Sequence, residues 1–126
     1  MSVLSIIGTI AAILAGLLHI FIFYMESIAW TSEKTRSTFG MTKEEANNTK
    51  EMAFNQGFYN LMLAVETLFG VCFMFFGNVI GKPLAMFGVL SMFSAAALLF
   101  FSSPDKRSAA IKQGTLPLIA LILLFL

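Results

Sequence analysis

The chain has 126 residues, of which 58% are hydrophobic and only 12% are charged, and its formal net charge is +1. Soluble domains carry about 25% charged residues, and a small domain exposes much of its surface, so a water-soluble globule is excluded. The near-neutral charge predicts no nucleic-acid partner, which would need a basic patch. The single cysteine, Cys72, excludes an internal disulfide and a multi-cysteine metal site. We expect the lipid bilayer to be the main partner.

Four segments are long and apolar enough to cross a bilayer, which takes roughly 20 mostly apolar residues. Backbone groups in lipid must be hydrogen-bonded within the segment, so we predict an all-α, integral membrane four-helix bundle in one domain, 1–126. The spans are predicted at about 3–28, 53–77, 83–103 and 106–126. The first span lacks a positively charged start and exceeds a signal peptide in apolar length, so we expect it to be retained.

The connections between the spans are short except for the first, a polar loop at about 31–52. Thr42 and Glu45 fit a capping box, with the threonine as N-cap and the glutamate at the third helical position. The second helix is therefore predicted to begin near Lys43 and to enter the membrane without a break. Breaker residues predict tight turns at 77–83 and 102–105.

Basic residues predict how the bundle is oriented, because cytoplasmic loops carry an excess of Lys and Arg. The opposite side carries only Lys82, whereas the first and third loops with their adjoining helix ends carry seven basic residues: Lys34, Arg36, Lys43, Lys50, Lys106, Arg107 and Lys112. We expect both of these loops to be cytoplasmic and both termini to lie outside (N-out/C-out), in a multi-pass membrane protein.

Glu66 is the one charge between Glu51 and Lys82, near the middle of the second span. An ionisable side chain there costs about 2.5–3.5 kcal/mol on insertion scales, and it is by default a candidate functional residue.

Helical periodicity groups further polar residues on faces. The first helix has one face with Gly8, Ala12, Ala15, His19, Phe23, Glu26 and Trp30, and its small residues permit close helix packing. The second aligns Asn55, Tyr59, Met62, Glu66 and Phe73, with Gln56, Asn60 and Thr67 beside them, and the fourth contributes Gln113. We expect a polar pocket in the cytoplasmic half with Glu66 at its floor. The alternative is that these groups only hold helices together, at about 0.6 kcal/mol per hydrogen bond.

Some of these residues form a pattern that resembles a known family. His19, Phe23, Glu26 and Trp30, then Phe39 and Gly40, then the hexapeptide NQGFYN at 55–60 followed by Leu63 and Ala64, resemble the bacterial family of small four-helix membrane proteins catalogued as domain of unknown function 1304. The resemblance covers nearly the whole chain and implies a fold and a multi-pass location in the bacterial plasma membrane, but no activity. It also implies a shared site of His19, Glu26, Trp30, Asn55, Gln56, Tyr59, Asn60 and Gln113. Glu66 lies outside the family motif.

Our first functional hypothesis is a pocket that binds, or acts by acid/base chemistry on, an apolar or amphipathic small molecule. The predicted catalytic groups are His19 and Glu26 as an acid/base pair, Tyr59 as a proton donor and Glu66 as a general acid. The predicted ligand-binding residues are Phe23, Trp30, Asn55, Gln56, Asn60 and Gln113. No motif indicates a cofactor or a metal site.

Two other functions stay open. Four short helices with a membrane-embedded glutamate are similar to the small multidrug exporters, which predicts a homodimer that exports lipophilic cations in exchange for protons. In those exporters the glutamate lies on the first helix, whereas Glu66 is on the second. A structural or accessory subunit is the third hypothesis, with the charged loop 33–51 docking a cytoplasmic partner.

Overall fold

The structure, a computed structural model, describes all residues 1–126 and contains helices and no strands. In chain order the elements are α1 (Val3–Phe23), the π-helical turn η1 (Tyr24–Ile28), α2 (Glu33–Phe39), α3 (Lys43–Asn48), α4 (Lys50–Phe75), α5 (Gly81–Ser102), the 3-10 turn η2 (Pro104–Lys106) and α6 (Arg107–Phe125). Four helical segments are long and apolar enough to cross a membrane: Val3–Ile28, Lys50–Phe75, Gly81–Ser102 and Pro104–Phe125. The predicted all-α bundle with four spans is confirmed.

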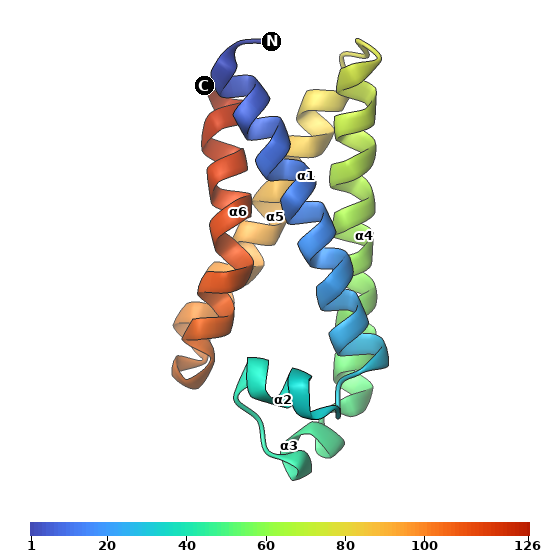
Figure 1. The fold of residues 1–126 in the computed structure, drawn as a ribbon, viewed down its shortest axis with the longest axis vertical. Coiled ribbons are helices and arrows are strands. Elements are labelled where there is room, and N and C mark those ends of the chain that lie inside the picture. The colour runs from blue at the N-terminus through green and yellow to red at the C-terminus, as the bar shows by residue number, and fades with distance from the viewer.

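The four long helices form a ring in which α1 and α5 each pack against both α4 and α6. Figure 1 shows both chain termini at one end of this bundle and the short helices α2 and α3 across the other end. The α5–α6 connection lies at the same end as α2 and α3 (Figure 1). The basic first and third loops therefore share one end of the molecule, as successive antiparallel spans require.

Small side chains let the helices approach closely. The main core cluster consists of Ala11, Ala12, Ala15, Val71, Ala85, Val89, Met92, Ala120 and Leu124. A Cβ added to Gly8 would lie 2.9 Å from Leu123 Cβ on α6, and one added to Gly16 would lie 2.9 Å from Leu68 Cγ on α4. The predicted small face of the first helix is therefore confirmed, and it lies between α4 and α6. Close packing of this kind replaces the hydrophobic effect, which does not drive helices together in lipid.

The entry into the second span differs from the prediction. The capping box of Thr42 and Glu45 is present at the start of α3, but the helix is interrupted at Thr49, where φ is −110° and ψ is 7°. The Thr49 hydroxyl donates to the Glu45 carbonyl at 2.8 Å and accepts from Trp30 Nε1 at 3.0 Å. Side-chain bonds of this type compete with the helical backbone, so the prediction of an unbroken helix was wrong.

The turn between α4 and α5 depends on one left-handed residue. Gly77 has φ +72°, and its N–H donates to the Met74 carbonyl at 3.1 Å while the Asn78 N–H donates to the Phe73 carbonyl at 2.9 Å. This is the Schellman arrangement that ends many helices.

Gly77→Ala is expected to lower the free energy of unfolding by about 1 kcal/mol, because a left-handed backbone brings Cβ too close to the carbonyl oxygen. No atom lies within 4 Å of an added Cβ, so a collision with a neighbour would contribute nothing. Thermal unfolding in detergent checks this, with Val79→Ala, at an exposed position of the same turn, as the control. Equal stability of Gly77→Ala and the parent chain would contradict the prediction.

Candidate functional site

The last turn of the first span is wider than an α-helix. Within η1 the Ala29 N–H donates to the Tyr24 carbonyl at 2.9 Å, five residues back along the chain. The Ser27 hydroxyl of the same turn donates to the Phe54 carbonyl of α4 at 2.8 Å. A Cβ added to Gly57 would collide with Ser27 Oγ and would lie 3.0 Å from Ser27 Cβ. Only a glycine on α4 leaves room for η1 here, and short π-helical segments are frequent at functional sites.

A buried polar pair joins η1 to α4. The Asn60 side-chain amide donates to Glu26 Oε1, and both residues are buried. The pair fixes the direction of one carboxylate oxygen, because buried polar atoms need hydrogen-bond partners. Glu26 also lines a cavity, and its carboxyl group is held by Asn60 of α4.

The cavity has a volume of about 240 Å³ and lies where η1, α3, α4 and η2 meet. Its lining residues are Glu26, Trp30, Met41, Glu45, Thr49, Met52, Ala53, Gln56 and Lys106. Carboxyl, amide, hydroxyl and ammonium groups thus share a small space with one indole and two thioethers. A concave site with apolar walls and a few convergent polar groups is the usual form of a small-molecule site.

Two residues, Trp30 and Lys106, hold the walls of this cavity. Trp30 donates through Nε1 to Thr49 Oγ1, and its ring packs against Phe39 with centroids 5.2 Å apart. Lys106 Nζ donates to the Phe39 carbonyl at 3.2 Å and lies 3.6 Å from Asp105 Oδ2. The ammonium group of Lys106 is therefore already engaged by protein oxygens.

His19 is almost completely buried, with 1% of its surface exposed. Its Nδ1 lies 2.9 Å from the Ala15 carbonyl oxygen one turn earlier. A carbonyl only accepts hydrogen bonds, so Nδ1 carries the hydrogen in this arrangement and Nε2 is the acceptor of the neutral ring. His19 is not among the residues that line the cavity of Glu26.

The structure brings together four of the predicted site residues and separates the others. Glu26, Trp30 and Gln56 line one cavity. Asn60 does not line it but donates a hydrogen bond to Glu26. Phe23 is half-buried and packs edge-on against Phe58 with ring centroids 5.7 Å apart. Gln113 lines a different cleft of about 120 Å³ among α1, α2 and α6. Asn55 and Tyr59 are exposed, and the Asn55 amide donates to the Glu51 carbonyl of its own helix.

The predicted place of Glu66 at the floor of the pocket is wrong. Glu66 is half-buried, has no hydrogen-bond or ion-pair partner and does not line the cavity. The buried stripe of α4 consists of Ala53, Gly57, Asn60, Ala64, Thr67, Gly70 and Val71. Most of these are small, so they let α1 and α5 approach, and the helix turns Glu66 away from α1.

Several cavity residues were missed by sequence reasoning. Glu45 and Thr49 belong to α3 and its break, and the capping box at 42–45 was the local signal for them. The small stripe with Gly57 was the signal for the inner face of α4. Lys106 had no local signal, because it reaches the cavity from the distant α5–α6 connection.

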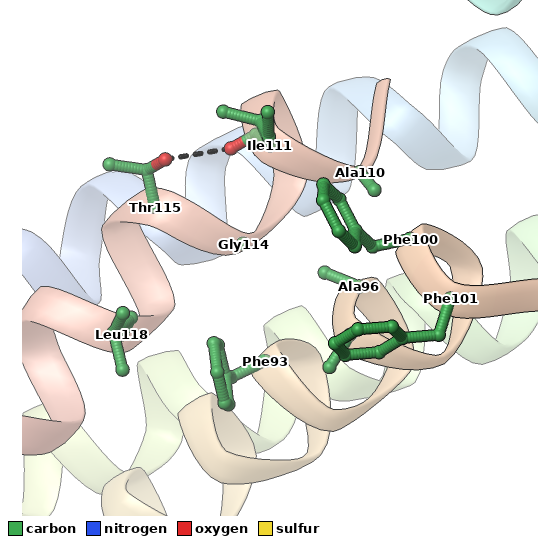
Figure 2. A pocket seen from close by; sticks show the side chains of 10 residues that line it. Phe93, Ala96, Phe100, Phe101, Ala110, Ile111, Gly114, Thr115 and Leu118 are labelled. Carbon is green, nitrogen blue, oxygen red and sulfur yellow. Dashed lines mark hydrogen bonds between the residues drawn. The ribbon is translucent and has the colours of Figure 1, made fainter. Parts of the chain in front are cut away.

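A second hollow lies between α5 and α6 and has a different character. Figure 2 shows Phe93, Phe100 and Leu118 around it, with the Thr115 hydroxyl bonded to the Ile111 carbonyl at 2.7 Å. The hollow has a volume of about 240 Å³ and eight of its ten lining residues are hydrophobic. The Thr115 hydroxyl already donates to the Ile111 carbonyl. This hollow therefore suits an apolar chain and offers no free polar group for chemistry.

The sequence matches a known protein family. The model of the family described as "Protein of unknown function (DUF1304)" matches residues 13–125. The chain belongs to this family. It is 27% identical over 121 residues to the uncharacterized protein YpaA of Lactococcus lactis subsp. lactis (strain IL1403), covering 94% of this chain and 97% of that protein. No solved structure matches the chain. The family resemblance predicted from the sequence is confirmed.

Proposed function

We propose that this DUF1304 protein binds a small amphipathic molecule in the cavity of Glu26. The observation that carries the proposal is a buried carboxyl group that α4 holds through Asn60 and that lines the cavity wall. Such a group in a membrane span is costly and is retained where it serves a function. The thioethers of Met41 and Met52 and the indole of Trp30 supply apolar contact for the rest of the ligand.

The charges around the cavity favour a ligand that donates hydrogen bonds. Glu26 and Glu45 are two acids, and the one base, Lys106, is engaged by Phe39 and Asp105. An ammonium or amine head near Glu26 would offset the excess of acidic groups, and Trp30 presents a ring that attracts cations. The volume equals about eight water molecules at roughly 30 Å³ each, so the ligand is smaller than a drug-sized compound.

The same arrangement suits proton transfer. A carboxyl group fixed by one hydrogen bond and open on its other side can take a proton from, or give one to, a bound amine or enol. Glu26 is the acid/base group in this proposal. Turnover would require the ligand head to lie within about 3.2 Å of its carboxylate oxygens.

We further propose that the protein is a multi-pass protein of the bacterial plasma membrane with both termini outside. The four apolar spans and the bacterial relative support the location. The seven basic residues near the cavity end, against Lys82 at the other, support the orientation. The cavity then opens toward the cytoplasm.

Trp30 provides a direct test of the ligand proposal, because it is the only tryptophan of the chain and it lines the cavity. We expect n-hexylamine to change Trp30 fluorescence in a saturable way, and n-hexanoate to do so much more weakly. Glu26→Gln should weaken n-hexylamine binding about tenfold or more, because a charge-assisted hydrogen bond contributes about 1.5–3 kcal/mol. The glutamine oxygen still accepts from Asn60, so the fold is kept.

Glu66→Gln is the matched control, since it removes a carboxyl group from the same helix bundle outside the cavity. It should bind n-hexylamine as the parent chain does. Two results would overturn the proposal: no saturable change with the amine, or equal affinities for the parent chain and Glu26→Gln.

A further inference from the structure

The outward face of α4 carries polar groups that the bundle leaves unsatisfied. Its residues follow at alternating steps of four and three: Asn55, Tyr59, Met62, Glu66, Phe69 and Phe73. Tyr59, Met62 and Phe69 are exposed by 68%, 56% and 59%. The spacing itself is that of any helix on the surface of a bundle. What distinguishes this face is Glu66, whose carboxyl group has no hydrogen-bond or ion-pair partner although the residue is half-buried.

Packing contacts place Glu66 well inside the apolar spans, away from the helix ends. It lies nine residues before the end of α4 at Phe75, or about 14 Å along the axis at 1.5 Å per residue. Its neighbour Leu68 meets Gly16, near the midpoint of the first span, and Thr67 meets Gly88, seven residues after the start of α5 at Gly81. Glu66 therefore lies well inside its span, nine residues from one end of α4 and sixteen from the other.

The other long helices present apolar side chains to lipid at this depth. Leu14 and Leu17 on α1, Phe87 and Leu90 on α5, and Leu118 on α6 are all exposed. Lipid solvates such side chains without any protein partner. It cannot donate or accept hydrogen bonds, so a carboxyl group that faces it stays unsatisfied.

We infer that α4 is a homodimer interface, in which Glu66 pairs with Glu66 of the partner subunit. Two copies with the same membrane topology are related by a twofold axis along the membrane normal, which brings the same residue of each copy together. A protonated carboxyl group has one donor and remaining acceptors, so two of them can satisfy each other. Tyr59 lies two turns nearer the α3 end of α4. It would face Tyr59 of the partner subunit in the same way. An apolar protein partner would leave Glu66 unsatisfied, which is why a second copy fits better.

Energy transfer between donor- and acceptor-labelled copies in liposomes tests the inference. We expect the parent chain to dimerise, and Glu66→Leu to raise the dissociation constant about threefold to tenfold, the range that membrane hydrogen bonds span. Glu66→Gln should dimerise as the parent does, because an amide also donates and accepts. Leu90→Ala, on the outward face of α5, is the control and should change nothing. Dimerisation that Glu66→Leu leaves intact, or a monomeric parent chain, would overturn the inference.

Cross-linking gives a second measurement that leaves Glu66 in place. In a Cys72→Ala background, Phe69→Cys should form disulfide-linked dimers in the membrane, whereas Leu90→Cys should not. Cross-linking at Leu90→Cys but not at Phe69→Cys would place the interface on α5 and reject the α4 pair. Glu66 does not line the Glu26 cavity, so loss of the dimer and loss of amine binding are separable results.

Discussion

Replacing Gly57 by leucine is expected to lower the free energy of unfolding by about 3 kcal/mol. Even a Cβ at this position would collide with the Ser27 hydroxyl and lie 3.0 Å from Ser27 N and Cβ. The nearest obstacle is therefore the Ser27 hydroxyl, and the backbone of η1 lies directly behind it, which limits how far the side chain can give way. Overpacking a close helix contact costs about 1–3 kcal/mol and occasionally more. Reversible unfolding in mixed micelles measures the loss.

The variants Gly57→Ala and Ser27→Gly show whether the contact between η1 and α4 causes the loss of stability. Gly57→Ala should also destabilise the protein, although alanine is the better helix former by about 1 kcal/mol. Ser27→Gly removes the two closest side-chain atoms, so Gly57→Ala should cost less in the Ser27→Gly background than in the parent chain. If the two costs are equal, the contact between η1 and α4 is not the source of the effect.

Because η1 also carries Glu26, the Gly57 variants should affect the site. Moving η1 away from α4 separates Glu26 from Asn60. We therefore expect Gly57→Leu to weaken binding of n-hexylamine as well as to lower stability, whereas Gly77→Ala at the far end lowers stability alone.

Asn60→Leu is expected to lower the free energy of unfolding by about 2–3 kcal/mol. The variant removes the hydrogen-bond donor of Glu26 Oε1 and leaves a buried carboxyl group without its partner. An unsatisfied buried polar group costs about 1–3 kcal/mol, and a charged one costs more. Glu26→Leu should cost less, because the group it leaves unpaired is a neutral amide.

The double variant Glu26→Leu with Asn60→Leu separates the hydrogen bond from the shape of the site. Replacing both partners by apolar groups can be nearly neutral, so the double variant should be more stable than the sum of the two single losses predicts. We expect a coupling energy of about 1–3 kcal/mol from this double-mutant cycle. Additive losses would mean that the pair does not interact in the folded protein. The single variant Asn55→Leu, at an exposed position of α4, serves as a control for the helix itself. It should lower the free energy of unfolding much less than Asn60→Leu does.

The four spans could be predicted because their signals are local. Long apolar runs, the breakers near Gly77 and Pro104, and the capping box of Thr42 and Glu45 act within a few residues, and each appears in the structure. The membrane partner follows from composition for the same reason. The break at Thr49 was missed because it depends on a hydrogen bond from Trp30, which comes from another part of the chain.

The site was only partly predictable. Glu26, Trp30, Gln56 and Asn60 lie together in the structure, because the end of the first span and the NQGFYN segment lie at the same depth. Lys106 was expected at the same end as the first loop, but nothing near it in the sequence shows that its side chain reaches the cavity of Glu26. Gln113 shares that depth but faces a different cleft, since depth alone does not set direction.

By itself the sequence determined that there are four spans, roughly where each of them ends and which side chains reach each depth. Only the tertiary structure decided which face of α4 turns inward. Asn55, Tyr59 and Glu66 lie on one face and Asn60 and Thr67 on another, and in lipid both the core and the surroundings are apolar, so polarity does not choose between them. Close packing does: Gly57 and Ala64 let neighbouring helices approach, which buries Asn60 beside Glu26 and leaves Glu66 on the outer face.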